Sequence, residues 1–272
     1  MKVSTHLHRL NNVFGSGTAW GYRRFCLAYA GNAVFNRPTL VRMTRRNRYR
    51  HEKKLLYTSM TAGYDALNEI PRPAENWDFI CYTDNPDIKS DTWQIRELNN
   101  ELKLDPVRLS RLVKINNHLV DSGYDLSVYV DANFKIRGDL DTFIAHVLPP
   151  GQSFAMQLHP FNSSLREELE LCIRVGKDDK DLLQKQYHHY VEDNHFTDPY
   201  PHVAAGMIVR RSGKEEIRKL METWFEQVLS WSRRDQMAFN FALDQHRVFP
   251  HYNPYWVLRR YLKKMDHGPS SP

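Results

Sequence analysis

The sequence predicts an α/β protein built on a mostly parallel sheet. Apolar runs rich in β-branched and aromatic residues alternate along the chain with segments that carry helix-start signals. Several of these runs end in Asp, Asn, Thr or His, which is typical of strands whose carboxyl ends form a ligand-binding edge. A length of 272 residues allows one sizeable α/β domain with appendages.

Six strands are expected, and each is a short apolar run bounded by turn residues. They cover residues 55–60, 78–84, 93–98, 126–130, 154–159 and 204–210. The first, second and fourth end in polar residues, the third alternates as a half-buried strand does, and Pro160 closes the fifth. Because strands and helices alternate, a mostly parallel sheet is expected.

Five helical segments are expected. They cover, in approximate bounds, residues 105–121, 139–146, 164–176, 213–231 and 233–246. Asp105-Pro106 supplies an N-cap and a first-turn proline for the first helix. Ser164-Leu-Arg-Glu167 has the pattern of a capping box that opens the third, and Gly176 is expected to end it.

The fourth strand leads directly into Asp131-Ala132-Asn133. Residues two apart on an extended backbone point to the same side, so Asp131 and Asn133 are expected to present a carboxylate and an amide oxygen together. Such oxygen ligands suit Mg²⁺ or Mn²⁺, which would in turn hold a diphosphate. The alternative is a turn that leads to Gly138, since Asp and Asn are common turn residues.

Charge is divided unevenly along the chain. Residues 1–54 hold 12 Lys and Arg against one acidic residue, a net charge of +11, whereas the remaining 26 basic and 31 acidic residues give −5. The basic segment could contact an anionic membrane, an acidic polymer or a nucleic acid, or it could be a solvated arm that flanks the body. No nucleic-acid motif with stacking aromatic residues accompanies the charge, so nucleic acid is not an expected partner.

Composition favours a cytoplasmic protein. No window holds about 18 uninterrupted apolar residues, so no transmembrane helix is expected. The apolar run at residues 25–30 is too short for a signal peptide. Cys26, Cys81 and Cys172 have neither paired nor metal-ligand spacing, which indicates a reducing compartment. A peripheral membrane contact through residues 1–54 is compatible with that location.

Six fragments, taken in order, resemble one known family. They are Tyr57-Thr58 with Gly63-Tyr64-Asp65, Asp78-Phe-Ile-Cys-Tyr-Thr-Asp84, Arg111-Leu-Val-Lys114-Ile with His118, Tyr129-Val-Asp131-Ala-Asn133, His159-Pro160, and Ser232-Arg-Arg234-Asp235-Gln236 with Phe239. On these fragments residues 55–243 resemble the glycosyltransferase-like domain once catalogued as domain of unknown function 616, found in bacteria and in plant Golgi proteins. Each fragment is weak alone, and six in order are fairly specific.

The resemblance implies a GT-A fold, in which a Rossmann-like nucleotide-binding half joins a smaller acceptor-binding half. The domain would cover residues 55–256, between the basic extension at 1–54 and a tail at 257–272. It would be a metal-dependent glycosyltransferase of polysaccharide biosynthesis, moving a sugar from a UDP- or GDP-sugar to a glycan, a lipid-linked acceptor or another surface acceptor.

The resemblance also assigns site residues. Those for the donor nucleotide and its diphosphate are Thr58, Asp84, Arg111, Lys114 and His118. Those for Mn²⁺ or Mg²⁺ are Asp131 and Asn133, with His251 as a candidate third ligand. Those near the donor sugar and acceptor are His159, Asp235 and Gln236. Asn133 stands where the family's motif has a second Asp, which suggests weaker metal binding or reliance on a third ligand.

Two of these assignments have structural alternatives. Arg111, Lys114 and His118 share one face of the predicted helix, which could bind a diphosphate or could simply be a solvated flank. Ser232-x-x-Asp235 is also a capping-box pattern, which would make Asp235 structural.

Two other functions compete with sugar transfer. One is a metal-dependent hydrolase, although the sequence lacks the Gly-x-Ser-x-Gly and His-Glu-x-x-His patterns. The other is a noncatalytic protein that binds a nucleotide or a sugar. Nucleotide binding separates sugar transfer from the hydrolase, and release of nucleoside diphosphate separates an enzyme from a binding protein.

Overall fold

The computed structural model describes residues 49–265, except residues 50, 64, 72 and 120–122. The chain divides into two units after Arg48, and all described elements belong to the second. The sequence also allows the basic segment to be a structural extension whose aromatic residues pack against the body; this alternative lies outside the described residues, as does Cys26. The aromatic residues in question are Trp20, Tyr22, Phe25 and Phe35.

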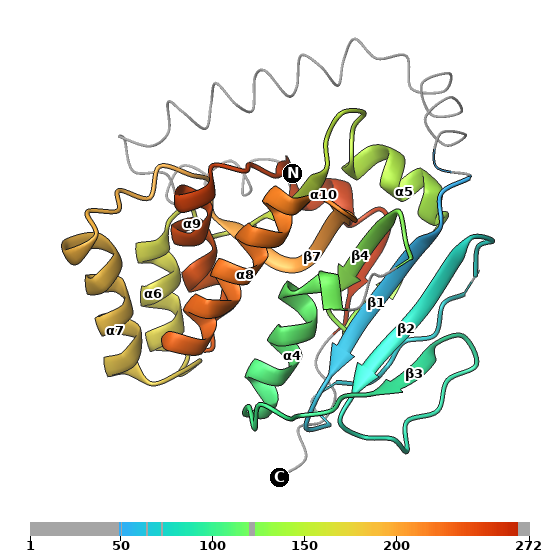
Figure 1. Cartoon of the computed structure of the whole chain (residues 1–272), viewed down its shortest axis with the longest axis horizontal. Coiled ribbons are helices and arrows are strands. Elements are labelled where there is room, and N and C mark those ends of the chain that lie inside the picture. Colours follow the sequence, from blue (N-terminus) through green and yellow to red (C-terminus); the bar gives the residue numbers. More distant parts are fainter. Residues whose placement is uncertain (1–48, 50, 64, 72, 120–122, 266–272) are drawn as a thin grey trace, which may run out of the picture. The chain divides into compact units, whose positions relative to one another are not determined.

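The expected GT-A-like α/β architecture, with a mostly parallel central sheet, is confirmed (Figure 1). The seven strands lie in the order β3-β2-β1-β4-β7-β6-β8, and β7 is antiparallel to both of its neighbours. Their bounds are β1 Lys54–Met60, β2 Trp77–Thr83, β3 Gln94–Glu97, β4 Leu126–Val130, β6 Phe154–Leu158, β7 Val203–Arg211 and β8 His251–Asn253. The parallel strands place their carboxyl ends along one edge of the sheet.

A second, two-stranded sheet was not expected from the sequence. It pairs β5 (Phe134–Ile136) with β9 (Leu262–Lys264) in antiparallel register. Strands of three residues are too short to show a periodic pattern. They form because Phe134, Ile136 and Leu262 are buried in the main core.

The helices follow the predicted order with two differences. Their bounds are α4 Pro106–Ile115, α5 Leu140–Val147, α6 Leu165–Arg174, α7 Lys180–His188, α8 Glu215–Ser230, α9 Asp235–His246 and α10 Tyr255–Leu258, with a 3₁₀ turn at Asn117–Leu119 and a π-helical turn at His189–Asp193. Asp105 and Ser164 cap α4 and α6 as predicted. The structure adds α7 and α10, and α4 ends at Ile115 rather than near residue 121. Among the described residues, none of the helices combines the length and the apolar character that crossing a membrane requires.

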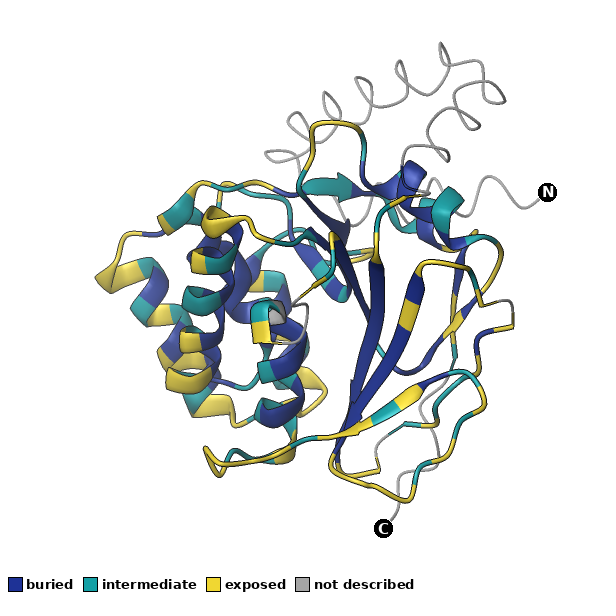
Figure 2. Cartoon of the chain, turned by 45° about the vertical axis from the view of Figure 1, so that its right-hand side comes forward, coloured by how far each residue is buried: buried dark blue, intermediate teal, exposed yellow. Residues whose placement is uncertain are grey.

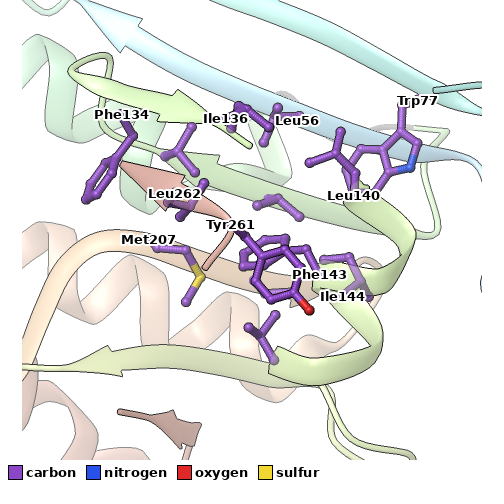
Figure 3. Packing of buried hydrophobic residues seen from close by; sticks show 14 of the residues in the cluster. Leu56, Trp77, Phe134, Ile136, Leu140, Phe143, Ile144, Met207, Tyr261 and Leu262 are labelled. Atoms are coloured by element: carbon purple, nitrogen blue, oxygen red, sulfur yellow. The ribbon is translucent and has the colours of Figure 1, made fainter. Parts of the chain in front are cut away.

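Apolar residues cover both faces of the sheet. One face packs against α5 and the β5–β9 sheet, in a cluster that includes Leu56, Phe143 and Tyr261 (Figure 3). The other face packs against α4, α8 and α9. A third cluster joins α6 and α7 to α9. The strands β1, β2, β4, β6 and β7 are buried almost throughout, whereas β3 and the outer sides of α6 and α7 are exposed (Figure 2).

A buried arginine links the sheet to α4. Arg210 of β7 is fully buried, and its guanidinium donates to the carbonyl oxygens of Ile115 at 2.7 Å and Lys114 at 2.9 Å. It also donates to the hydroxyl of Tyr57 on β1. A cation at the carboxyl end of a helix satisfies carbonyls that have no partner within the helix. Arg210 therefore fixes where α4 ends.

Candidate active site

Asp131 lies at the end of β4, where the chain turns. Its backbone N–H donates to Gly206 of β7 at 3.0 Å, and its carbonyl accepts from the N–H of Phe134 at 2.9 Å. The side chain is 33% exposed. Gly206 leaves room for it, because a β-carbon at that position would lie 3.0 Å from the Asp131 Oδ2 atom. The carboxylate thus rests against the backbone of β7 and still reaches solvent.

Asn133 occupies a different environment. Because residues 131–134 form a turn, the extended backbone expected here is wrong. Asn133 is only 2% exposed. Its side-chain NH₂ donates to the Met265 backbone carbonyl at 3.3 Å, and its backbone carbonyl accepts from the Met265 N–H at 2.8 Å. Its Oδ1 atom is buried and has no hydrogen-bond partner within the described part of the chain. Asn133 therefore fastens the end of β9 and keeps one unused acceptor.

Lys114 joins two carboxylates that are far apart in the sequence. Its Nζ atom lies 2.7 Å from Asp235 Oδ2 and 3.5 Å from Asp131 Oδ1, and its side chain is 3% exposed. Arg111, one turn earlier on α4, places its Nε atom 3.3 Å from the same Asp235 oxygen. The Tyr129 hydroxyl donates to Asp131 Oδ1 at 3.1 Å. The ends of β4, α4 and α9 meet in these contacts.

Asp235 is held ionised by its neighbours. Burial alone would raise the pKa of its carboxyl, but Arg111, Lys114 and Arg234 outweigh burial and hold that pKa well below the usual range. The capping box that was the structural alternative for Asp235 does not form. Ser232 instead donates its hydroxyl to Gln186 at 2.5 Å, and α9 begins after Arg234 without a side-chain cap.

A second group of contacts continues from Arg234. Its Nη2 atom lies 3.3 Å from Glu168 Oε1 and 3.3 Å from Gln236 Oε1. Glu168 is buried on α6, where it also accepts from the Asn162 amide at 2.6 Å and lies 3.6 Å from His202 Nε2. Burial would raise the pKa of Glu168, but the nearby His202, then Arg234 and the hydrogen bond from Asn162, lower it to about 2. Glu168 is therefore a permanent anion at this site.

His159 follows β6 at the same edge of the sheet. Its backbone N–H donates to the His202 backbone carbonyl at 2.9 Å. Its ring Nδ1 accepts from the backbone N–H groups of Asn162 at 2.6 Å and Phe161 at 3.2 Å. Burial, then the charge of His202, lowers the pKa of His159 to about 4. The ring is neutral at neutral pH, with its proton on Nε2, because Nδ1 is occupied as an acceptor.

The other predicted site residues lie outside these contacts. Thr58 is not at the end of its strand, since β1 continues to Met60, and its side chain is fully buried. Asp84 does follow β2 and is exposed, where its carboxylate accepts from the Ala62 N–H at 3.0 and 3.1 Å. His118 lies beyond α4 and faces Glu222 at 3.7 Å. His251 is on β8, three strands from β4 and so roughly 14 Å across the sheet.

Sequence patterns alone did not identify Glu168 and His202. Glu168 lies among Glu167 and Glu170, so it looks like part of a solvated helix face. His202 precedes β7 without any motif around it. One signal for Glu168 was present in the sequence. Arg234 stands next to Asp235 at the start of a predicted helix, and a charge that becomes buried there needs a partner of opposite charge.

The site offers oxygen ligands for a cation but no preformed cluster. Among the described ranges, no group of three or more His, Cys, Asp or Glu side chains could hold a metal ion. The candidates are the exposed carboxylate of Asp131 and the unused Oδ1 of Asn133. Hard divalent cations prefer such ligands and keep several waters. By donor chemistry these two oxygens suit a hard divalent cation, but they lie in different environments, that of Asp131 reaching solvent and that of Asn133 buried.

Comparison with known proteins identifies a family. The family model described as TOD1/MUCI70, glycosyltransferase-like domain, matches residues 81–261. That range begins inside β2 and ends before β9, so it includes Asp131, Lys114, Glu168 and Asp235. No curated protein matches the chain.

Proposed function

Because the chain belongs to the TOD1/MUCI70 glycosyltransferase-like family, we propose that it transfers a sugar from a nucleotide-sugar donor to a glycan or other surface acceptor. Family membership supports glycosyltransferase activity in general, and the choice of donor, acceptor and metal belongs to the proposal. The observation that carries it is the position of Lys114, buried between Asp131 and Asp235 at the carboxyl edge of the sheet.

The basic residues of the site suit a diphosphate. Arg111 and Arg234 keep 17% and 19% of their side chains exposed, so each has donors left for a ligand. A guanidinium binds phosphate oxygens through two parallel N–H groups, which a Lys ammonium cannot do. Asp235 contacts Arg111 and Lys114 and thereby fixes their positions before the donor arrives. We assign Asp235 this positioning role in place of a catalytic one, because its carboxyl is 1% exposed and already paired.

Sugar transfer breaks the bond between the anomeric carbon and the diphosphate oxygen of the donor. The acceptor hydroxyl oxygen forms the new bond and releases its proton to water, and negative charge grows on the departing nucleoside diphosphate. Cations that are already in place stabilise this charge without having to rearrange. His159 offers its Nε2–H as a donor to a sugar hydroxyl, because its Nδ1 is occupied and its pKa is about 4. Gln236 is held beside it by a hydrogen bond to the Val203 carbonyl at 3.1 Å.

Asp131 and Asn133 are the residues that we propose for Mn²⁺ or Mg²⁺. The unused, buried Oδ1 of Asn133 and the solvent-reaching carboxylate of Asp131 support this choice. When bound, the ion would supply positive charge to the leaving diphosphate. An amide in place of a second carboxylate implies modest affinity, since it lacks the charge that strengthens ion binding.

Nucleotide-dependent stabilisation tests the proposal. UDP or GDP with Mn²⁺ should raise the unfolding temperature by several degrees, since ligand at 100 times its dissociation constant stabilises a protein by about 2.7 kcal/mol. EDTA should reduce this rise in unfolding temperature. In the Asp131→Ala variant, EDTA should cause no further reduction. A nucleotide panel without any shift would contradict the donor assignment. Binding without release of nucleoside diphosphate from nucleotide-sugars would instead indicate a noncatalytic binding protein.

We further propose that the protein works in the cytoplasm and that residues 1–54 draw it to anionic membrane. The net charge of +11 in that segment supports the contact, and Cys81 and Cys172 are free and buried, as in reducing compartments. Replacing Arg42, Arg45 and Arg46 by Ser in the full chain should weaken vesicle binding at low salt. Unchanged binding would remove this role for the segment.

A further inference from the structure

The β5–β9 sheet and the turn before it carry an exposed group of basic residues. We call this group the cationic surface; it consists of Lys135, Arg137, Arg259, Arg260 and Lys263, all of them exposed. The segments that contribute them, residues 133–138 and 254–265, contain no acidic residue. None of the five forms an ion pair with any residue in the described ranges. The surface therefore presents its positive charge to solvent.

The register of the two strands places like charges together. Lys135 is directly opposite Lys263 in the antiparallel pair, so the two side chains leave the same face of the sheet. Like charges in this position destabilise a strand pair. After β5, the nearest acidic residues along the chain act elsewhere. Asp139 caps α5, and Asp141 accepts from Trp77 and pairs with Lys54. Folding alone gives no reason for this pair of lysines.

An exposed tryptophan adjoins the cations. Trp256 on α10 is 66% exposed. Arg259 and Arg260 follow it by three and four residues, and the helical hydrogen bonds from Arg259 to Tyr255 and from Arg260 to Val257 continue through that turn. Residues at these spacings are neighbours on a helical surface. An indole among cations is the arrangement that proteins present to the boundary between lipid headgroups and acyl chains.

We propose that the cationic surface, together with Trp256, docks the protein on an anionic phospholipid bilayer. The cations are complementary to acidic headgroups, and the indole adds an anchor that an acidic polymer in solution would not need. Docking would also orient the candidate site. Asn133 is hydrogen-bonded to Met265 directly after β9, so the turn that carries Asp131 borders the docked surface. This contact uses other residues than the proposed contact of residues 1–54, and it does not depend on the identity of the donor.

Charge-reversed variants of the full chain test the proposal. The probes are vesicles of phosphatidylcholine with about a third phosphatidylglycerol and vesicles of phosphatidylcholine alone. Lys135→Glu with Lys263→Glu should weaken binding to the acidic vesicles by about 30-fold or more, because each cation near the surface contributes about fivefold. The matched control, Lys177→Glu with Lys185→Glu, makes the same charge change at exposed positions near and on α7 and should bind within about threefold of the unchanged protein.

Two further variants separate docking from folding and from polymer binding. Lys135→Glu alone places opposite charges across the strand pair, so the unfolding temperature should not fall although vesicle binding does. Trp256→Ala should weaken vesicle binding while leaving binding to soluble heparin unchanged. Equal vesicle binding by the double variant and its control would overturn the proposal. Loss of heparin binding alone in the double variant would also overturn it and would assign the surface to an acidic polymer.

Discussion

Replacing Lys114 by Met tests whether the buried ammonium holds the candidate site together. Met keeps the unbranched shape of the side chain, and the Lys114 carbonyl would still accept from Arg210, so the backbone of α4 should stay in place. What disappears is a charge 2.7 Å from Asp235 and 3.5 Å from Asp131. The variant therefore isolates the electrostatic contribution of Lys114.

The expected cost follows from burial. The side chains of Lys114 and Asp235 are 3% and 2% exposed, and removing one partner of a buried pair costs about 3–5 kcal/mol. Arg111 remains 3.3 Å from Asp235, which favours the lower end, about 3 kcal/mol. At 2–4 °C for each kcal/mol in a domain of this size, the unfolding temperature should fall by about 6–12 °C.

A double-mutant cycle supplies the decisive measurement. Asp235→Asn removes the charge that Lys114 balances. In the Asp235→Asn background, the loss of unfolding free energy caused by Lys114→Met should therefore be smaller by at least about 1.5 kcal/mol. Urea denaturation of the four proteins gives this coupling. Lys219→Met is the control, because Lys219 is 59% exposed in a surface pair with Glu215 and should change stability by less than about 0.5 kcal/mol. If the two effects add within about 0.5 kcal/mol, the reasoning about Lys114 is refuted.

Three other outcomes are expected. Asp131→Ala should abolish sugar transfer while the protein still folds, and its unfolding temperature should fall less than that of Lys114→Met, because Asp131 is the more exposed and more distant partner of Lys114. Asn133→Asp should destabilise the protein, because a carboxylate would face the Met265 carbonyl, and Mn²⁺ should relieve that loss. Thermal unfolding and product release measure both. Gly206→Ala should reduce both turnover and stability, since its β-carbon would lie 3.0 Å from the Asp131 carboxylate and 3.0 Å from the buried Phe134 ring. The pKa of His159 is lowered from 6.5 to about 4, so between pH 4 and 6.5 the unfolded chain binds more protons than the folded chain. The free energy of unfolding should therefore fall, by up to about 3 kcal/mol, as the pH drops from 6.5 to 4. His159→Gln should flatten this slope in urea titrations, and an unchanged slope would contradict the buried neutral ring.

The order and type of the main elements could be predicted because their signals are local. The buried runs at β1, β2, β4 and β6 are continuous in the sequence and bounded by polar residues. The end of α4 could not be predicted, because the residue that caps it, Arg210, is 95 positions further on. Three-residue strands such as β5 likewise depend on a distant partner rather than on a pattern of their own.

Part of the candidate site could also be predicted, because residues on one helix face form a local pattern. Arg111 and Lys114 were expected on one helix face, and the structure brings both to Asp235. His118 was expected with them, but the helix has already ended there. Whether Ser232 would cap α9 depended on Gln186, a tertiary partner that no spacing rule reveals. The chemistry of a segment is visible in its residues, whereas the partner of each polar group is set by the fold.

The buried Arg210 also sets the order in which the protein can be completed during synthesis. Lys114 is fastened by a residue 96 positions later, and at 5–20 residues per second the ribosome needs roughly 5–20 s to make the intervening chain. During that interval the edge of β4 that later pairs with β7 stays open, which is the kind of strand edge that promotes aggregation. Such non-local pairing also slows folding. A nascent chain stalled before β7 would therefore lack the anchored Lys114 and would carry an unprotected strand edge for a chaperone to cover.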